Sequence, residues 1–346
     1  MRANFKGRDF LSLLDFSKEE FEYILDVASD LKRRNAIGEL HNHILPAKSL
    51  YMIFYNQSLR TRNSFESGMT QLGGHAHYLA SDKIYTPAIE GEEKAYSTER
   101  VSDVARTLSR FGHAIAIRMY GPPTNWIYGK AHSYIREFAK WADIPVINME
   151  CDKYHPCQAG ADMLTIKEKL GGFKGKKFVM SWAYSPSYEK PLSVPQSAII
   201  AATKLGMDVV QVQPHGFELD DKIIYACKDM AEQNASKFEI MYDMEEAFKD
   251  ADVVYPKCWG AKKEFDNLGK GDDIAMRKLF EKNKNWICNQ DILSLAKKNV
   301  LYMHCLPADR GFEVTDDVID GPNSVVFDEA ENRLHFQKAV MALIMR

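Results

Sequence analysis

Short apolar runs alternate with amphipathic segments along this chain, in two successive series. Runs of this kind are typical of buried strands. They are predicted at 49–55, 75–79, 113–119 and 145–149 in the first series and at 177–182, 208–213, 238–242, 252–255 and 300–304 in the second. Helical spacing is predicted at 162–170, 195–205, 221–235, 273–281 and 329–345. Because strands that alternate with helices are joined by crossovers, the pattern predicts an α/β fold with two doubly wound parallel-sheet domains that divide near residue 150.

Two helix starts carry local signals of their own. Ser17 and Glu20 form a capping box ahead of a helix whose apolar stripe begins at Phe21. A second helix is predicted to follow Ser58 and to end at the glycine pair 73–74. Both helices are therefore predicted from end signals as well as from periodicity.

Composition narrows the class of protein. The chain has 346 residues, and 45 Lys and Arg against 48 Asp and Glu give a net charge of −3, which argues against a general nucleic-acid-binding protein. No apolar run approaches the ~18 residues of a membrane span, and the first residues lack the apolar core of a signal peptide. The six cysteines include no CxxC pair and no spacing typical of a metal site. We therefore expect a cytoplasmic protein with free thiols and no metal.

The segment after the first predicted strand is a candidate anion site. Ser58, Arg60, Thr61 and Arg62 lie where the strand ends and the next helix begins. Unpaired N–H groups and the positive end of the helix dipole favour an anion at such a junction. Two arginines this close together are unfavourable unless an anion or carboxylates compensate them. The alternative is that both arginines are surface charges and that Ser58 only caps the helix.

Other predicted strands also end in groups that could contact a ligand. In an open α/β sheet, ligands lie beyond the carboxyl ends of the strands. Arg118 ends one strand, the pair His155 and Gln158 follows another, and Lys257 follows a third. Each of these residues could equally be a solvated or capping residue.

Cys305 lies at the end of the last predicted strand. It could be a nucleophile, a soft contact to an amine, or a buried thiol. The neighbouring His304 should point to the opposite face of the strand, which argues against a Cys–His dyad.

These segments together resemble the aspartate/ornithine carbamoyltransferases. The matching elements are the SxRTR motif at 58–62, Arg118, the HPxQ motif at 155–158, the HCLP motif at 304–307 and the ENR motif ending at Arg333, in family order. The resemblance implies a carbamoyl-phosphate-binding domain at 1–150, onto which the terminal helix 329–346 packs, and an acceptor-binding domain at 151–328. It also implies a cytoplasmic homotrimer that needs no cofactor, and carbamoyl phosphate and an amino-acid-like amine as partners.

The resemblance also implies a role for each matched residue. Carbamoyl phosphate would be bound by Ser58, Leu59, Arg60, Thr61, Arg118, His155, Gln158, Leu306 and Arg333. The catalytic residues would be Arg118, His155, Gln158, Cys305 and Arg333. The acceptor would contact Lys257, Cys305, Leu306 and Glu150.

Within the family, the proline-rich loop 186–195 and the element around Lys257 resemble the knotted branch, which contains the N-acetylornithine enzymes. We therefore expect a trefoil knot in the C-terminal domain. The segment 81–90 lacks the tryptophan of the N-acetylornithine enzymes, so the acceptor stays open between an amino acid and an N-acylated diamino acid. The alternatives are transfer to a diaminopropionate- or putrescine-like amine, or a catalytically silent phosphate-binding homologue.

Overall fold

A computed structural model describes residues 4–346, and the chain divides into two compact units. The first unit contains the residues up to Thr124, then Gly129–Cys157 and Arg333–Arg346. The second contains Asn125–Tyr128 and Gln158–Asn332. The chain passes between the units on either side of the short segment Asn125–Tyr128 and within two helices, α5 (Pro156–Leu170) and α13 (Val326–Ile344).

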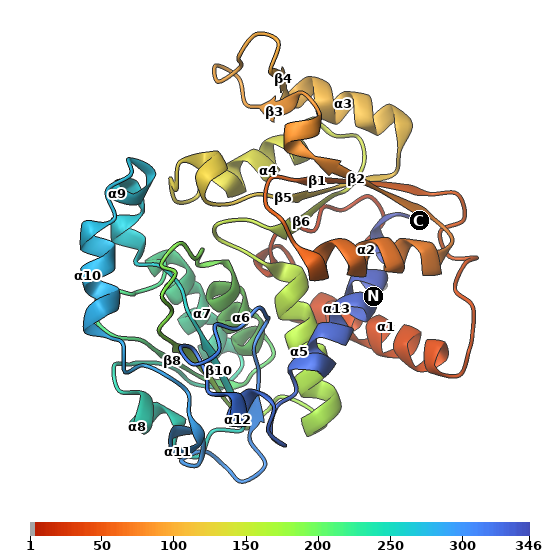
Figure 1. Ribbon diagram of the computed structural model, residues 1–346. Helices are drawn as coiled ribbons and strands as arrows, with labels where there is room; N and C mark the ends of the chain where they lie inside the picture. The colour runs from red at the N-terminus through yellow and green to blue at the C-terminus, as the bar shows by residue number, and fades with distance from the viewer. Residues whose placement is uncertain (1–3) are drawn as a thin grey trace. The chain divides into compact units, whose positions relative to one another are not determined.

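The first unit is built on a four-stranded parallel sheet of order β2-β1-β5-β6. Its strands are β1 (Ser49–Phe54), β2 (His75–Ala80), β5 (Ala114–Arg118) and β6 (Val146–Glu150). Its helices are α1 (Lys18–Ala36), α2 (Leu59–Leu72), α3 (Val101–Phe111) and α4 (Lys130–Trp141). Figure 1 shows α3 and α4 on one face of this sheet and α1 and α2 on the other. The terminal part of α13 packs beside α1, where Phe336 lies edge-on to Phe21.

Two short strands, β3 (Thr86–Ala88) and β4 (Thr98–Arg100), form a separate parallel pair in the first unit. The segment between them is mostly exposed, and Tyr96 is 96% exposed. No strand was predicted here, because three residues give too little alternation to recognise.

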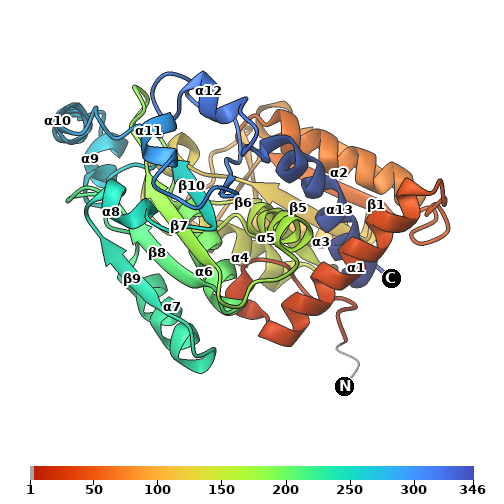
Figure 2. The same ribbon diagram turned by 90° about the horizontal axis from the view of Figure 1, so that it is seen from below.

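The second unit contains a five-stranded parallel sheet of order β11-β10-β7-β8-β9. Its strands are β7 (Lys177–Trp182), β8 (Asp208–Val212), β9 (Phe238–Met241), β10 (Val253–Lys257) and β11 (Leu301–Tyr302). Besides most of α5, its helices are α6 (Ser193–Lys204), α7 (Asp221–Gln233), α8 (Met244–Phe248), α9 (Phe265–Gly269), α10 (Ile274–Lys282), α11 (Gln290–Leu293) and α12 (Asp316–Ile319). Figure 2 shows the strands β7 to β9 side by side with α7 at their edge. Every residue of α6 is buried.

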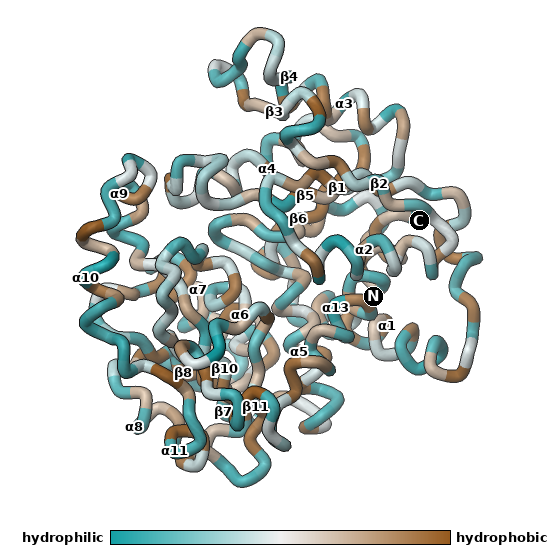
Figure 3. The backbone as a smooth tube through the Cα atoms, in the orientation of Figure 1, coloured by the Kyte–Doolittle hydropathy of each residue, from teal (hydrophilic) through white to brown (hydrophobic). Residues whose placement is uncertain are grey.

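The apolar runs of the sequence form the interiors of both sheets. In β5 all five residues are buried, and in β10 likewise. Strands covered on both faces need such continuous apolar runs. In Figure 3 the backbone of β1 and β5 is largely hydrophobic, while hydrophilic stretches lie in the outer loops. No helix among residues 4–346 is both long and apolar enough to span a bilayer.

The predicted α/β class with parallel sheets is confirmed, and each long predicted strand is present within a few residues. The largest error in a boundary concerns α5. It begins at Pro156, six residues before the predicted start at 162. Proline suits the first position of a helix, because its φ is already helical and the N–H that it lacks would have no partner there.

Candidate active site

The predicted anion site forms at the start of α2. Ser58 caps this helix, and its hydroxyl accepts a hydrogen bond from the backbone N–H of Thr61 at 3.2 Å. The helix has no acidic residue in its first turn. The positive end of the dipole is therefore not neutralised by the helix itself, which suits an anionic ligand.

Hydrogen bonds join the segments that follow β1 and β5, beside the start of α2. The Asn56 side chain donates to the Tyr120 carbonyl at 3.1 Å and accepts from the Tyr120 N–H at 2.9 Å. The register of the sheet places Phe54 of β1 opposite Arg118 of β5. The two strand ends therefore deliver the helix start and Arg118 to one place.

Two buried guanidinium groups meet at the Thr61 hydroxyl. Arg333 Nη2 donates to Thr61 Oγ1 at 3.1 Å, and Arg118 Nη1 lies 3.5 Å from the same oxygen. Both arginines are at most 7% exposed. The structure thus brings together three residues that are 57 and 272 positions apart in the sequence.

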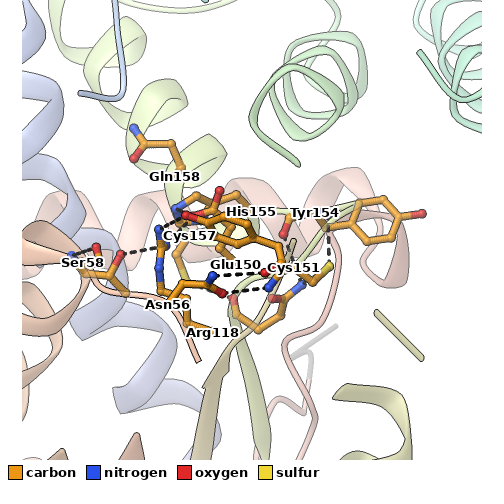
Figure 4. Close-up of polar contacts among 12 residues, drawn as sticks. Asn56, Ser58, Arg118, Glu150, Cys151, Tyr154, His155, Cys157 and Gln158 are labelled. Carbon is orange, nitrogen blue, oxygen red and sulfur yellow. Dashed lines mark hydrogen bonds and ion pairs between the residues drawn. The ribbon is translucent and has the colours of Figure 1, made fainter. Parts of the chain in front are cut away.

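A carboxylate and an imidazole complete this cluster. Glu150, at the end of β6, forms a buried ion pair with Arg118, and its Oε2 lies 3.6 Å from His155 Nε2. Figure 4 shows Arg118, Glu150 and His155 gathered together with Asn56 and Ser58 beside them. Burial would lower the pKa of Arg118, but Glu150 and Tyr120 raise it above its ordinary value, so the guanidinium stays charged.

His155 is held in its neutral form. Burial lowers its pKa well below the ordinary value, and the charges of Arg333, Arg118 and Arg60 lower it further. The three arginines contribute three positive charges around His155, whereas Glu150 contributes one negative charge. A neutral imidazole among guanidinium groups can donate one hydrogen bond without adding charge, and the net positive charge suits a doubly charged phosphate.

Arg62 does not join this cluster. Its Nε donates to Glu66 Oε1 at 2.9 Å, and its guanidinium lies 3.8 Å from the centre of the Tyr78 ring. Of the alternatives that the sequence left open for the two arginines, compensation by a carboxylate is therefore the one found for Arg62. A carboxylate one helical turn away compensates its charge.

Arg333 is oriented by a neighbour on α13. When the Gln337 amide is placed so that both of its ends are satisfied, its oxygen accepts from Arg333 Nη2 at 3.1 Å and from Arg333 Nε at 3.2 Å. Its nitrogen then donates to Ser64 Oγ on α2 at 2.6 Å. Gln337 thus ties the Arg333 guanidinium to the helix that forms the anion site.

In the second unit, Gln158 lies in the first turn of α5 and contacts two buried acids. Its Nε2 donates to Asp162 Oδ1 at 2.8 Å and to Glu329 Oε1 at 2.9 Å. Glu329 also accepts from the Tyr255 hydroxyl at 3.1 Å and from the His304 N–H at 3.0 Å. Burial raises the pKa of Glu329 well above its ordinary value, and the neighbouring carboxyl of Asp162 raises it further.

A second buried carboxylate, Glu313, holds the segment around Lys257. Lys257 Nζ lies 3.1 Å from Glu313 Oε1, and His304 Nε2 lies 3.2 Å from Glu313 Oε2. The N–H groups of Cys258 and Asp309 each donate to Glu313 at 2.7 Å. Burial would raise the pKa of Glu313, but Lys257 and His304 lower it well below its ordinary value. Lys257 therefore reaches the strand end as a charged group that is already paired with a carboxylate.

Cys305 and Leu306 follow β11 in a constrained turn. Cys305 is partly exposed and hydrogen-bonds to Tyr255. Leu306 has a φ of 53°, in the left-handed region that a leucine side chain disfavours by ~1–2 kcal/mol. Its N–H donates to His304 Nδ1 at 2.9 Å, so His304 supports this turn and does not pair with Cys305.

Models of one family match both parts of the chain. Residues 8–168 match the aspartate/ornithine carbamoyltransferase carbamoyl-P binding domain, and residues 190–344 match the Asp/Orn binding domain. The chain belongs to the aspartate/ornithine carbamoyltransferase family.

Named relatives within this carbamoyltransferase family cover the whole chain. Ornithine carbamoyltransferase of Pyrococcus abyssi is 42% identical over 345 residues, which is 100% of this chain and 98% of the relative. That of Carboxydothermus hydrogenoformans is 40% identical over the full length of both. Among solved structures, ornithine carbamoyltransferase from Pyrococcus furiosus has a TM-score of 0.85 at 41% identity and covers 99% of this chain and 98% of that one. Acetylornithine transcarbamylase complexed with acetylcitrulline has a TM-score of 0.90 at 34% identity and covers 98% and 99%.

Sequence reasoning missed four polar residues that contact candidate site residues within their own unit: Asp162, Glu313 and Glu329 in the second unit and Gln337 in the first. Each lies in a helix or a loop, outside the strand ends that were searched for ligands. The spacing of Gln158 and Asp162, one helical turn apart, was an available signal for their contact. The roles that the resemblance assigns to individual residues stay predictions.

Proposed function

We propose that the chain transfers the carbamoyl group of carbamoyl phosphate to the primary amine of an ornithine-like amino acid and releases phosphate. The observation that carries this proposal is the meeting of Arg118 and Arg333 at the Thr61 hydroxyl, in the turn that Ser58 caps. A phosphate dianion there would gain charge-assisted hydrogen bonds and the dipole of α2. Arg60 would be its third guanidinium partner.

The same cluster would stabilise the reaction's intermediate. Attack of a neutral amine on the carbonyl carbon of carbamoyl phosphate places negative charge on the carbonyl oxygen, and the C–O bond to phosphate then breaks. Arg118, His155 and Arg333 would donate to that oxygen. One good donor of this kind is worth roughly 3–4 kcal/mol of barrier. Gln158 and the carbonyl of Leu306 would accept from the carbamoyl NH2.

The acceptor must lose a proton to react. An alkyl amine has an ordinary pKa of ~10.4, so the site must favour its neutral form. We propose that Cys305 contacts this amine and that the departing phosphate takes the proton released after attack. Lys257 would bind the acceptor's carboxylate through N–H groups beyond the one directed at Glu313, because an ammonium has three donors. Glu150 would also belong to the acceptor side, as the resemblance implies, although its described partners are Arg118 and His155.

Ornithine is the first acceptor to test, because the relatives at 38–42% identity carry the name ornithine carbamoyltransferase. A solved N-acetyl-L-ornithine transcarbamylase variant was complexed with carbamyl phosphate and N-succinyl-L-norvaline, so N-acylated diamino acids belong in the same panel. A colorimetric ureido assay over ornithine, N-acetylornithine, diaminopropionate and putrescine would rank them. We expect an amine that carries a carboxylate to be carbamoylated fastest, because Lys257 would otherwise have no role toward the acceptor.

The decisive test compares two arginines of one helix. Arg60→Ala should abolish turnover and weaken the binding of phosphate. Arg62→Ala is the matched control, since Arg62 pairs with Glu66 and stacks on Tyr78. Phosphate affinity within about twofold of wild type is expected for this control, because a pair that is nearly half exposed contributes little. Equal effects of the two changes would contradict the assignment of the anion site.

Finer properties follow from family membership alone, and we propose them as such. A homotrimer should give three times 39.5 kDa by light scattering. The loop 81–90, which exposes Tyr85, is the segment to probe for a role in a neighbouring subunit's site. The trefoil knot stands on the same resemblance, whereas the proposed cytoplasmic location rests on the pattern of cysteines in the sequence. Hydrogen bonds from Ala183 N to Lys257 O and from Gly260 N to Lys190 O hold the proline-rich loop against the end of β10.

A further inference from the structure

Two histidines lie next to each other on an edge strand of the first unit. β2 is an outer strand of its sheet, and His75 and His77 are two positions apart in it. Because side chains alternate along a strand, both imidazoles project from the same face. Tyr78 projects from the other face, where the guanidinium of Arg62 on α2 lies against its ring. The ring centroids of His75 and His77 are 4.6 Å apart, and their planes are at 82°. The strand therefore holds two imidazoles side by side.

Neither imidazole has a hydrogen-bond or ion-pair partner within the described part of the chain. His77 stacks on Tyr51 of β1 with 4.9 Å between the ring centroids, and His75 meets His77 edge to face. His75 is exposed and His77 is partly buried. Burial and the neighbouring His75 lower the pKa of His77 below its ordinary value, which favours the neutral ring. A neutral imidazole offers one nitrogen lone pair, which is the group that a metal ion binds.

The spacing of the two rings matches that of two imidazoles on one metal ion. An imidazole nitrogen lies about 2.1 Å from a divalent transition metal, which places the ring centroid roughly 3.2 Å from the ion. Two rings at a right angle about the ion have centroids about 4.5 Å apart, whereas a tetrahedral angle needs about 5.2 Å. The observed 4.6 Å fits the right angle, which is the geometry typical of Cu²⁺ and Ni²⁺.

Turning the rings does not change this spacing. The Cβ–Cγ bond of a histidine points at the ring centroid, so rotation about it moves the nitrogens and leaves the centroid in place. The preferences of this torsion are broad. His75 is exposed and can turn, and a half-turn of His77 exchanges nitrogen and carbon while its stack on Tyr51 is kept. A nitrogen of each ring can therefore be directed at one point without any movement of β2.

We propose that His75 and His77 form an exchangeable binding site for a divalent transition-metal ion, Ni²⁺ or Cu²⁺, with the two imidazoles at adjacent coordination positions. No group of three or more His, Cys, Asp or Glu side chains among residues 4–346 is placed to hold a metal. Water must therefore supply the remaining ligands, and the ion should exchange with solution. The second imidazole adds affinity because it binds at a high effective concentration. The site takes no part in the proposed carbamoyl transfer.

His113 provides a matched control, because it is a third imidazole near the same end of the sheet. Its backbone N–H donates to Ser49, which lies opposite His75 in the register of β1 and β2. Its Nδ1, however, accepts a hydrogen bond from the Ser49 N–H at 3.2 Å. The neutral ring then carries its proton on Nε2 and has no lone pair left for a metal. His113→Gln should therefore leave metal binding unchanged.

Isothermal titration calorimetry with Ni²⁺ on the intact protein measures the site, in a buffer that does not bind metals. Wild type should bind one Ni²⁺ ion whose affinity falls at least about tenfold in His75→Gln and in His77→Gln, because each change leaves one imidazole of the pair. His113→Gln should bind within about twofold of wild type. With Cu²⁺, the electron paramagnetic resonance spectrum should show coupling to two nitrogens in wild type and to one in either variant.

Three results would overturn the proposal. The first is a wild type that binds Ni²⁺ no more tightly than His75→Gln does. The second is an equal loss of affinity in His113→Gln and His77→Gln, because the ion would then use an imidazole that the hydrogen bond from Ser49 excludes. The third is tighter binding of Zn²⁺ than of Cu²⁺, which would indicate a tetrahedral site. If circular dichroism shows that His77→Gln does not fold, His75→Gln decides the question, because His75 is exposed.

Discussion

Glu150 is the residue whose replacement tests the electrostatics of the site most directly. Glu150→Gln keeps the size of the side chain and one oxygen, but it removes the negative charge beside Arg118 and His155. In the absence of a ligand this charge compensates the buried guanidinium. In the presence of a phosphate dianion it would instead repel the ligand. The change should therefore destabilise the free protein and increase the stabilisation that bound phosphate gives to the folded protein.

The size of the expected loss in stability follows from the burial of the Arg118–Glu150 pair. The side chains of Arg118 and Glu150 are 9% and 8% exposed. Removing one partner of such a pair costs ~3–5 kcal/mol, and the oxygen that glutamine keeps should reduce this to about 2–3 kcal/mol. For a unit of this size, a loss of 1 kcal/mol lowers the Tm by roughly 2–4 °C, so a decrease of about 4–12 °C is expected.

The additional stabilisation of Glu150→Gln by phosphate can be estimated as well. A carboxylate and a phosphate that share the Arg118 guanidinium would lie roughly 7 Å apart. At an effective dielectric constant near ~20 they would repel by about 2 kcal/mol. A phosphate concentration near 100 times Kd stabilises the wild type by about 2.7 kcal/mol, and the variant should gain about 1–2 kcal/mol beyond that.

Urea unfolding followed by circular dichroism, with phosphate or with sodium chloride at matched ionic strength, measures both quantities. Glu66→Gln is the control, because its pair with Arg62 is 44% and 32% exposed and should contribute less than about 1 kcal/mol. If Glu150→Gln is as stable as wild type without anion, the pair does not compensate a buried charge. If phosphate stabilises both proteins equally, the anion does not bind at Arg118.

Three further predictions concern other groups. Burial lowers the pKa of Lys338 from 10.5 to about 8, so the unfolded chain binds more protons than the folded protein between these pH values. The unfolding free energy of wild type should therefore rise with pH in this range relative to that of Lys338→Met. Urea titrations in which the two proteins show parallel pH profiles would refute this. Burial and the charges of Arg333, Arg118 and Arg60 hold the pKa of His155 well below its ordinary value, so carbamoyl-phosphate affinity should show no step near pH 6.5 that His155→Gln removes. Such a step would show that His155 takes up a proton. Gln337→Leu releases the Arg333 guanidinium and should lower kcat by about tenfold, the equivalent of one lost hydrogen bond to a charged group. Gln337→Glu keeps an acceptor for Arg333 and should recover most of the lost kcat. Steady-state kinetics in which the leucine and glutamate variants behave alike would reject the orienting role.

The sequence by itself determined the fold class and the candidate residues at the strand ends. Apolar runs with the length of strands, separated by helical periodicity, leave few arrangements other than parallel sheets joined by crossovers. The placement of Ser58 and Thr61 at the start of α2 followed from the same local pattern. These features depend on neighbours along the chain, so they can be predicted without knowing the tertiary structure.

Only the tertiary structure decided which charges meet. Arg60 and Arg62 are indistinguishable by composition, but Arg62 points to Glu66 and Tyr78, while the charge of Arg60 reaches His155. The partner of Lys257 is Glu313, 56 positions away. A buried charge finds its partner through the packing of distant segments, and no local periodicity encodes that choice. The positions of the acids around Gln158 were therefore beyond prediction from strand ends alone, because the sheet and α13 bring them together from distant parts of the sequence.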